Sequence, residues 1–264
     1  MNYFENKIIW VTGASSGIGQ EICKQLAEKD AIIILSARNS ENLTEIKSNL
    51  KNNGKHFVLP LNLEKTETFK AAFDQILNKY GRLDILFNNG GVSQRAEAHE
   101  TSLEIDRKIM EVNYFGNIAL TKTVLPHFQN NKAGHIIITS SIAGKFGFYL
   151  RSAYSASKHA LHGYYESVAL ENLKNNIAVT LLCPGKINTP ISTNALRGDG
   201  MKHNIMDHNQ ETGMSVEDCV QQILKAVSKK KREVFIGNKE ILAVYIKRFF
   251  PNLFWKIILK QKAT

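Results

Sequence analysis

With 264 residues, of which 43% are hydrophobic, the chain is long enough for one domain with a sizeable core and an appendage. Three widely separated cysteines show neither the spacing of a metal site nor that of a disulfide framework. The net charge of +10 is uneven, because residues 1–228 hold 24 basic and 22 acidic side chains and residues 229–264 hold ten and two. The positive charge therefore belongs to a C-terminal tail. The body of the protein is nearly neutral, which excludes a broad nucleic-acid footprint on it.

Cysteine usage and the N-terminus both bear on the compartment. Cysteines without the spacing of a disulfide framework are expected to be free thiols, which is typical of proteins in a reducing environment. The N-terminus runs almost directly into a strand, which leaves no room for a signal peptide or a transit segment. We therefore expect the protein in the cytoplasm.

The first strand is expected over residues 7–12, and it runs into Thr12-Gly-Ala-Ser-Ser-Gly-Ile-Gly19. A helix follows, with Ile22 and Leu26 on one face. A strand, a glycine-rich turn and a helix form a phosphate cradle, because glycines let the backbone approach a pyrophosphate at the helix N-terminus. The alternative is an ordinary glycine-rich turn. The cradle would use Gly13, Ser15, Ser16, Gly17, Ile18 and Gly19.

The second strand, residues 31–37, is followed by Arg38, and no carboxylate occurs before Glu41. In dinucleotide folds an acidic residue at this place binds the ribose 2′-hydroxyl, whereas an arginine accommodates a 2′-phosphate. Arg38 therefore favours NADP over NAD. The alternative is a solvated arginine side chain.

The alternation of strands and helices continues along the middle of the chain. Helices are expected at 41–52 and 66–80, and strands at 57–61 and 83–87. The last of these strands ends in Asn88-Asn-Gly-Gly91, a small-residue turn at the end where ligands bind in open parallel sheets.

A long helix is predicted from the capping box Thr101-Ser-Leu-Glu104 to about residue 130. It contains Asn113. Asparagine has a poor helix propensity and is usually only tolerated inside a helix, so its position alone does not indicate a function for Asn113. The next strand, 134–141, places Ser140 and Ser141 at its C-terminal end.

The helix expected over residues 152–175 carries Tyr154 and Lys158, which lie on one face because they are four residues apart. A phenol has an ordinary pKa near 10, and an ammonium about 4 Å away favours the phenolate by roughly three pK units. This pair predicts an acid–base catalyst. The alternative is a helix-surface pair.

The last strands are expected at 177–183 and 233–236, and the first of them runs into Pro184-Gly-Lys-Ile-Asn-Thr189. The polar segment 191–213 is too long for a simple connection and is interpreted as a lid over a site. Seven strands alternating with helices predict an α/β fold with a doubly wound parallel sheet, the Rossmann arrangement, over residues 1–238. Residues 239–264 are interpreted as a basic, aromatic-rich C-terminal extension.

These motifs, in this order, resemble the short-chain dehydrogenase/reductase superfamily over about residues 6–238. Further pieces that match are Ser140-Ser-Ile-Ala-Gly144, Tyr154-Ser-Ala-Ser-Lys158, and Pro184-Gly185 with Thr189. Within the superfamily, the sequence looks most like a membrane-associated branch. That branch includes reductases of acyl-dihydroxyacetone phosphate and of retinoid or steroid carbonyls.

The resemblance implies catalytic roles. Tyr154 would protonate the carbonyl oxygen during reduction, and Lys158 would lower the pKa of Tyr154 and bind the nicotinamide ribose. Ser141 would polarise the carbonyl, with Ser140 as the weaker candidate, and Asn113 would anchor a proton-relay water. Further cofactor contacts would come from Asn62, Leu63, Asn88, Gly90, Pro184, Ile187 and Thr189. Asn62 stands where the family often has an aspartate, and Gly90 where it usually has an alanine.

The tail segment 241–260 has fourteen apolar residues of twenty, but Lys247, Arg248, Pro251 and Lys256 interrupt them. It is therefore not expected to span a membrane. A basic amphipathic segment suits the membrane interface, which suggests docking on the inner membrane surface. The alternative is packing on the body or on a subunit partner.

The sequence therefore predicts an oxidoreductase that transfers a hydride between NADP(H) and a carbonyl or alcohol, working mainly as an NADPH-dependent reductase of a lipophilic ketone or aldehyde. One alternative is a reductase of a soluble 3-oxoacyl thioester or sugar ketone. Another is a non-catalytic NADP-binding sensor or membrane scaffold.

The resemblance implies a homodimer or homotetramer through helices 103–130 and 152–175. His159 and His162 are interpreted as surface or packed histidines, and no metal site is expected.

Overall fold

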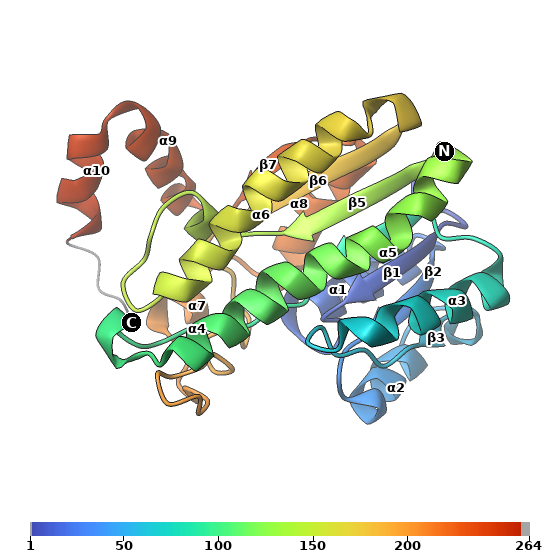
Figure 1. Ribbon diagram of the computed structural model, residues 1–264, viewed down its shortest axis with the longest axis horizontal. Coiled ribbons are helices and arrows are strands. Elements are labelled where there is room, and N and C mark those ends of the chain that lie inside the picture. Colours follow the sequence, from blue (N-terminus) through green and yellow to red (C-terminus); the bar gives the residue numbers. More distant parts are fainter. Residues whose placement is uncertain (1, 260–264) are drawn as a thin grey trace.

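The computed structural model describes residues 2–259, which form one parallel sheet with helices on both faces (Figure 1). Within these residues, seven strands pair in the order β3-β2-β1-β4-β5-β6-β7, and every pair is parallel. This confirms the predicted doubly wound sheet. The strands are β1 (Ile8–Thr12), β2 (Ile32–Ser36), β3 (Phe57–Val58), β4 (Ile85–Asn88), β5 (Gly134–Thr139), β6 (Ile177–Pro184) and β7 (Glu233–Ile236).

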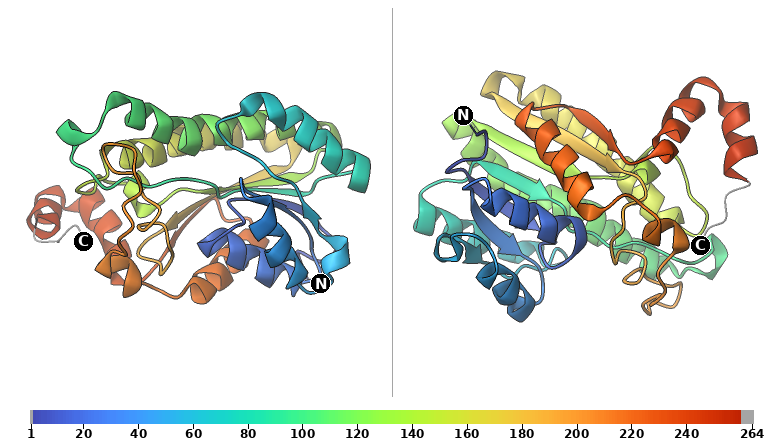
Figure 2. Two further views of the ribbon diagram at one scale, coloured as in Figure 1. Left: turned by 90° about the horizontal axis from the view of Figure 1, so that it is seen from below. Right: turned by 180° about the vertical axis from the view of Figure 1, so that it is seen from behind.

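The helices divide between the two faces of the sheet (Figure 2). Helices α1, α2 and α8 pack on one face, and α3, α5 and α6 pack on the other. The helices are α1 (Gly17–Ala27), α2 (Ser40–Ser48), α3 (Phe69–Tyr80), α4 (Leu103–Met110), α5 (Gly116–Asn131), α6 (Ser152–Glu171), α7 (His208–Glu211), α8 (Val216–Ser228), α9 (Leu242–Phe249) and α10 (Pro251–Ile258).

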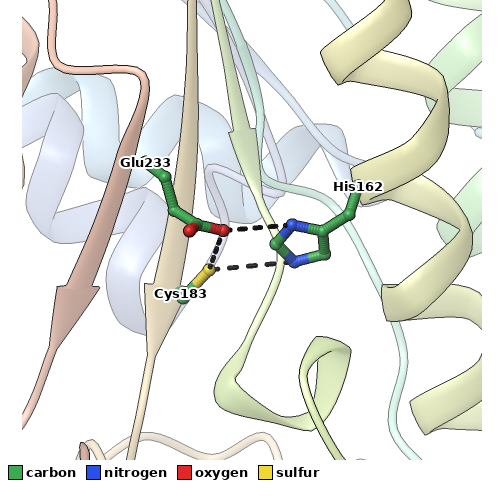
Figure 3. Close-up of side chains that lie close together, drawn as sticks. All are labelled: His162, Cys183 and Glu233. Atoms are coloured by element: carbon green, nitrogen blue, oxygen red, sulfur yellow. Dashed lines mark hydrogen bonds and ion pairs between the residues drawn. The ribbon is translucent and has the colours of Figure 1, made fainter. Parts of the chain in front are cut away.

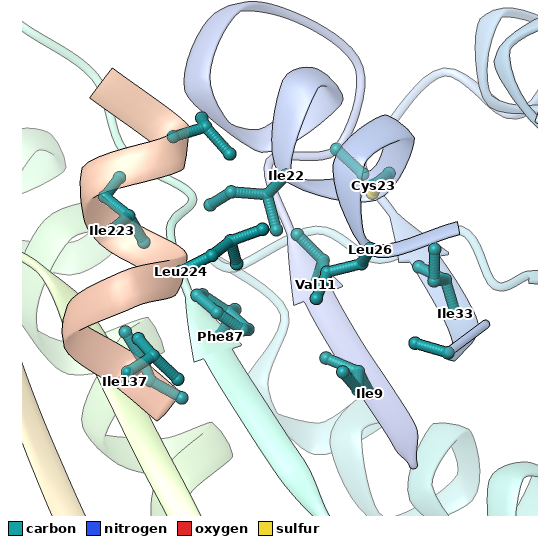
Figure 4. Packing of buried hydrophobic residues seen from close by; sticks show 14 of the residues in the cluster. Ile9, Val11, Ile22, Cys23, Leu26, Ile33, Phe87, Ile137, Ile223 and Leu224 are labelled. Carbon is teal, nitrogen blue, oxygen red and sulfur yellow. The ribbon is translucent and has the colours of Figure 1, made fainter. Parts of the chain in front are cut away.

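Side chains of β1 alternate between the two cores because successive residues of a strand point to opposite faces. Ile9 and Val11 belong to the core under α1 and α8, which Figure 4 shows, whereas Trp10 belongs to the core under α3 and α5. The strand is buried on both faces, as continuous apolar runs in parallel sheets usually are. Each large apolar side chain buried in this way contributes about 1.5–3 kcal/mol.

The strand order creates the place where a ligand can bind. From β1 the chain moves outward through β2 and β3, then returns to the other side of β1 to form β4. The connections after β1 and β4 therefore diverge, which opens a crevice at the carboxyl ends of these two strands.

Two elements differ from the sequence prediction. Strand β3 ends at Val58 rather than at 61, because Pro60 has no N–H to donate, although the N–H groups of Leu59 and Leu61 still reach the carbonyls of Leu35 and Ala37. The long helix expected over 103–130 is divided by a π-helical turn at Glu111–Phe115.

The C-terminal helices α9 and α10 pack on the body beyond β7 (Figure 1). Phe254 is buried against Phe146 at a ring-centroid distance of 5.0 Å, and Lys247 Nζ donates to the carbonyl of Lys145 at 2.8 Å. The opposite side of both helices is exposed. Residue 260, the last of the predicted tail segment, lies outside the described residues, as do residues 261–264 of the extension.

Candidate active site

A cavity of about 720 Å³ lies at the carboxyl ends of the strands. Its walls come from the ends of β1, β2, β4, β5 and β6, from segment 191–213 and from α10. Three of the predicted site residues, Gly19, Asn88 and Asn113, are not among its lining. The predicted residues that line it are Gly13, Ser15, Ser16, Gly17, Ile18, Arg38, Asn62, Leu63, Gly90, Ser141, Tyr154, Lys158, Pro184, Ile187 and Thr189.

The turn between β1 and α1 requires its glycines. Gly13 and Gly17 have φ angles of 66° and 52°, in the left-handed region that strains other side chains. Gly19 is needed for a different reason, since a Cβ there would collide with the carbonyl oxygen of Gly13. The start of α1 therefore lies directly against the turn, and the unpaired N–H groups of its first turn adjoin the cavity, as anion binding at a helix N-terminus requires.

Arg38 lies two residues beyond the end of β2, exposed on the cavity wall. Asn39 caps α2 by accepting a hydrogen bond from the N–H of Asn42 at 3.1 Å, which fixes the backbone beside Arg38. Among the described residues that line the cavity, Glu64 is the one with an acidic side chain. The wall at the end of β2 is therefore basic.

Asn62 and Asn88 differ in how free their side chains are. Asn62 lines the cavity, but its Oδ1 already accepts a hydrogen bond from the N–H of Glu64 at 3.1 Å. Asn88 is buried, and its amide donates to Thr121 Oγ1 at 2.8 Å and to the Tyr165 hydroxyl at 3.2 Å. The side chain of Asn88 thus stabilises the core rather than facing a ligand.

Thr12 holds the turn that follows β4. Its hydroxyl oxygen accepts hydrogen bonds from the N–H groups of Asn89 and Gly90 at 3.1 and 3.0 Å. A Cβ on Gly90 would lie 2.7 Å from Leu63 Cδ1, so the alanine that the family usually has here would require the end of this leucine side chain to shift. The ends of β1 and β4 are thereby joined beneath the cavity.

Asn113 lies in the π-helical turn, fully buried behind the cavity. Its Oδ1 accepts from the N–H of Val92 at 2.8 Å, and its Nδ2 donates to the carbonyl of Val92 and to Ser157 Oγ at 2.9 and 3.0 Å. The side chain therefore clamps the loop after β4 to α6. Single-turn π insertions are frequent at functional sites, and this one directs an asparagine inward.

The two serines after β5 have different surroundings. Ser140 is buried, and its hydroxyl contacts the carbonyl of Lys158 at 3.1 Å and His162 Nε2 at 3.0 Å. Ser141 faces the cavity and hydrogen-bonds to Tyr154, and its oxygen accepts from the N–H of Ala143 at 3.1 Å. The structure thus favours Ser141 as the serine that can meet a ligand.

Tyr154 and Lys158 lie on one face of α6 and both line the cavity, as their spacing predicts. Lys158 Nζ donates to the carbonyl of Thr139 at 2.7 Å and lies 5.7 Å from the centroid of the Tyr154 ring. Both side chains are almost fully buried. A hydroxyl and an ammonium are therefore presented side by side at the end of β5.

Burial dominates the titration of this pair. Burial raises the pKa of Tyr154 above its ordinary value, against the opposing effects of its hydrogen bond to Ser141 and of the charges on Arg151 and Arg95. Burial also lowers the pKa of Lys158 to about 8. The sequence expectation that Lys158 brings the pKa of Tyr154 down thus differs from the structure, in which desolvation outweighs nearby positive charge.

The segment after β6 closes the cavity over the glycine-rich turn. Thr189 is buried, and its methyl side lies close to Gly17, where a Cβ would approach within 3.2 Å. Pro184 and Ile187 line the cavity nearby, and the carbonyl of Pro184 accepts from Ser141 Oγ at 3.3 Å. The end of β6 thus connects the glycine-rich turn to the Ser–Tyr–Lys group.

The sequence profile of the short chain dehydrogenase family matches residues 7–200. The chain belongs to the short-chain dehydrogenase/reductase family of oxidoreductases. It is 39% identical to dehydrogenase/reductase SDR family member 7B of Mus musculus, over 98% of this chain and 82% of that one. It is 36% identical to dehydrogenase/reductase SDR family protein 7-like of Anopheles gambiae, over 98% and 84%.

Solved structures agree on the fold of this short-chain dehydrogenase/reductase. A family member from Burkholderia phymatum, in complex with NAD, superposes with a TM-score of 0.82 at 22% identity, covering all of this chain and 98% of that one. An alcohol dehydrogenase from the archaeon Thermococcus sibiricus, complexed with 5-hydroxy-NADP, superposes with a TM-score of 0.76 at 22% identity, covering 89% and 97%.

Sequence reasoning missed the residues that support the substrate side of this short-chain dehydrogenase/reductase. Gln94 is fully buried, and its Oε1 accepts from the N–H groups of Ala153 and Tyr154 at 2.9 and 3.3 Å. It therefore caps α6 from a distant loop. Arg95 and Arg151 line the cavity beside Tyr154. No local pattern marks these three residues, since each gains its role from a segment more than 50 positions away.

His162, Cys183 and Glu233 form a group in this family member that could hold a metal ion (Figure 3). His162 Nδ1 lies 3.3 Å from the carboxylate of Glu233, whereas Nε2 contacts Ser140 at 3.0 Å and Cys183 Sγ at 3.8 Å. Because the carboxylate and the thiol face different imidazole nitrogens, the group is better suited to a hydrogen-bonded chain than to one ion. Glu233 is also paired with Lys145 at 2.5 Å.

Among residues 2–259, no helix combines the length and the hydropathy that crossing a bilayer requires.

Proposed function

We propose that this short-chain dehydrogenase/reductase transfers a hydride between NADP(H) and a carbonyl or alcohol, and that it works mainly as an NADPH-dependent carbonyl reductase. The observation that carries the proposal is one continuous cavity. It runs from the glycine-rich turn and Arg38 to a wall on which Ser141, Tyr154 and Lys158 stand together. A pure binding protein has no need for an acid at the end of its nucleotide site.

The residues present suit a nicotinamide dinucleotide phosphate. The positive φ of Gly13 and Gly17 leaves a cradle without side chains at the N-terminus of α1, which fits a pyrophosphate. Arg38 offers a guanidinium to a 2′-phosphate, and no carboxylate at the end of β2 competes for it or repels that phosphate. Leu63, beside Asn62, offers an apolar surface for the adenine ring.

The catalytic groups have distinct tasks. When bound, the cofactor supplies the hydride. Tyr154 donates the proton that the carbonyl oxygen needs, and burial keeps its hydroxyl protonated at neutral pH because it raises the pKa. Ser141 donates a hydrogen bond to the same oxygen and polarises the carbonyl. Lys158 binds the ribose hydroxyls, and its carbonyl contact at Thr139 fixes the direction of its stem.

The substrate half of the cavity favours a lipophilic ketone or aldehyde. Apolar side chains line it beyond the catalytic group, from the loop after β5, from segment 191–213 and from α10. They are Phe148, Tyr149, Ile191, Leu196 and Ile258. In a cell that keeps NADPH reduced, the reaction runs toward the alcohol. A panel of lipophilic carbonyls tests this assignment. The assignment is wrong if the protein reduces none of them and instead turns over 3-oxoacyl thioesters or sugar ketones.

Helices α9 and α10 are proposed to dock on anionic lipid at the inner surface of the cytoplasmic membrane. Their buried side carries Phe254, while Phe249, Phe250 and Trp255 are 68%, 63% and 59% exposed. Lys256 and Arg248 lie among them. Aromatic side chains and basic residues on one helix pair suit a membrane interface. Because Ile258 of α10 lines the cavity, docking would bring the substrate entrance to the bilayer.

Liposome flotation tests the docking. We expect flotation with vesicles containing anionic lipid, loss of flotation in the double variant Phe249→Ser/Phe250→Ser, and little binding to neutral vesicles. Substitution is preferable to truncation because removing α10 would uncover Phe146. Equal flotation of the double variant and the unchanged protein would refute the docking surface.

The protein is also proposed to form a homodimer or homotetramer through α4, α5 and α6. Large apolar side chains are exposed on or next to these helices in the described chain. They are Leu103, Phe115, Leu170 and Leu173. Light scattering after size exclusion measures the mass directly, and a monomer at micromolar concentration would contradict the proposal.

Fluorescence titration with NADPH and NADH tests the function first. NADPH is expected to bind more tightly, and the variant Arg38→Asp is expected to lose that preference. Turnover of a carbonyl panel with NADPH should then disappear in Tyr154→Phe, although NADPH binding persists. A biological activity that survives Tyr154→Phe would favour a non-catalytic NADP-binding sensor or membrane scaffold instead.

A further inference from the structure

A buried ion cluster joins segment 191–213 to two loops outside it. The side chain of Asp207, in that segment, is fully buried, and that of Arg95 is 1% exposed. Arg95 Nε lies 2.9 Å from Asp207 Oδ2 and 3.3 Å from Oδ1, and Arg151 Nη2 donates to Oδ2 at 2.9 Å. Arg95 follows β4 and Arg151 directly precedes α6, so one carboxylate connects three separate parts of the chain.

The backbone fastens the same segment at a second place. The N–H of Arg95 donates to the carbonyl of Leu196 at 2.8 Å, and the N–H of Leu196 donates to the carbonyl of Ser93 at 2.9 Å. These bonds do not depend on charge. The C-terminal part of segment 191–213 is thus joined to the two arginines through the carboxylate of Asp207.

The cluster is not neutral. Within residues 2–259, two guanidinium groups share the Asp207 carboxylate, and burial together with the charge of Arg95 lowers the pKa of Arg151 to about 10. His203 lies 3.9 Å from Asp207, and burial lowers the pKa of this imidazole, so it stays uncharged at neutral pH. A net positive charge therefore remains next to Tyr154, which stands three residues after Arg151 in α6.

We infer that Asp207 is a positioning residue for the reaction: its carboxylate holds segment 191–213 as a lid over the substrate half of the cavity and fixes two arginine charges beside Tyr154. This inference rests on the proposed carbonyl reduction. The groups that face Tyr154 are Ser141 from the end of β5, Lys158 one turn further along α6, and the two arginines. Asp207 acts through the arginines, since it touches neither a reacting atom nor Tyr154.

Two neutral variants of the cluster separate an electrostatic role from a structural one. In reduction, Tyr154 must be protonated, so activity falls as pH rises through its pKa. Arg151→Gln removes a positive charge and should move this basic limb of kcat/KM upward by about one pH unit. Asp207→Asn removes a negative charge and should move the limb downward. A merely structural contact would give both variants the same direction of change.

The experiment measures turnover, cofactor binding and lid protection in the full chain. Asp207→Asn is expected to lower kcat/KM about 100-fold, because a misplaced lid costs orientation, while the Kd for NADPH changes less than about twofold. Trypsin should cut after Arg197 or Lys202 faster than in the unchanged protein. Asp199→Asn is the matched control, because Asp199 forms an exposed pair with Arg197 in the same segment.

Each outcome decides the inference. Opposite shifts of the two pH limbs with faster tryptic cleavage support it. The inference is overturned if the pH limbs of the two variants shift in the same direction. It is also overturned if the tryptic protection and the kcat/KM of Asp207→Asn match those of Asp199→Asn. If Asp207→Asn does not fold, Arg151→Gln is decisive because it breaks one of the two arginine contacts of Asp207. An upward shift together with faster tryptic cleavage supports the inference, and the absence of either overturns it. An unchanged protein that reduces no carbonyl refutes the proposed function instead, and tryptic protection then still reports whether Asp207 holds the lid.

Discussion

The two halves of the cavity are built in different ways. The cofactor half consists mainly of backbone from a short continuous stretch, the turn between β1 and α1, with Arg38 added from the end of β2. The substrate half consists of side chains from the loop after β4, the start of α6, segment 191–213 and α10. Backbone geometry follows from a few glycines, whereas the substrate half depends on long-range contacts between charged and polar side chains.

The largest expected effect would separate chemistry from cofactor binding. Tyr154→Phe removes the proposed proton donor without changing the glycine-rich turn, and general acids contribute about 10²–10⁴-fold to rate. We therefore expect kcat to fall about 1,000-fold while the Kd for NADPH remains within about twofold. Stopped-flow reduction and fluorescence titration measure the two quantities. Tyr164→Phe, on the same helix but away from the cavity, is the control and should retain turnover.

The second effect tests the cofactor half alone. Arg38→Asp replaces a guanidinium by a carboxylate where a 2′-phosphate is expected, and charge-assisted hydrogen bonds contribute about 1.5–3 kcal/mol. NADPH should bind roughly 100-fold more weakly, and NADH should become the better cofactor for the same carbonyl substrate. Arg107→Asp, on the exposed side of α4, provides the matched charge change. Retention of the NADPH preference would show that Arg38 does not read the phosphate.

How far the sequence predicts the molecule follows the same division. The seven-strand sheet and the turn at Gly13 could be predicted because strand periodicity and glycine spacing are local properties. Strand β3 ends at Val58 because Pro60 has no N–H, which is a cause that the sequence itself contains. The π-helical turn around Asn113 could not be predicted, because the side chain of Asn113 is held by hydrogen bonds to the distant residues Val92 and Ser157. The role of Gln94 was missed for the same reason.

The expected pKa of Tyr154 shows a related limit. The spacing of Tyr154 and Lys158 gives their common face, but it does not give their burial. Desolvation of both groups outweighs their mutual effect, and the positive charges that lower the pKa of Tyr154 come from Arg95 and Arg151. Burial is a tertiary property, so a pair of residues on one helix is insufficient to predict a titration.

The third expected effect concerns stability rather than rate. Burial lowers the pKa of Lys158 to about 8, below its ordinary value of 10.5, so the unfolded chain binds this proton more tightly. The free energy of unfolding should therefore rise between pH 8 and 10.5 because of Lys158. Lys158→Met removes the buried charge and loses the bond to Thr139, for an expected net gain of about 1–3 kcal/mol at pH 7.

Urea unfolding at several pH values measures this gain. The variant should be more stable than the unchanged protein at pH 7, and its stability should not rise above pH 8. It should also be inactive, which would show that the buried lysine lowers stability in exchange for function. Lys70→Met, at an exposed lysine paired with Asp74, is the control and should change stability by less than about 1 kcal/mol. A Lys158→Met protein that is less stable at every pH would contradict the burial cost.

The smallest expected effect tests whether the substrate half of the cavity positions α6. Gln94→Leu keeps the approximate volume but removes the oxygen that caps α6 at Ala153 and Tyr154, and lost caps cost about 0.5–2 kcal/mol. We expect the Tm to fall by about 2–4 °C per kcal/mol and kcat to fall several-fold, with NADPH binding unchanged. Gln25→Leu, on α1 and partly exposed, is the matched control for removing a glutamine amide. If Gln94→Leu changes Tm and kcat no more than the control does, α6 holds its place through Lys158, Ser140 and the core alone, and the substrate half depends on fewer long-range contacts than its structure suggests.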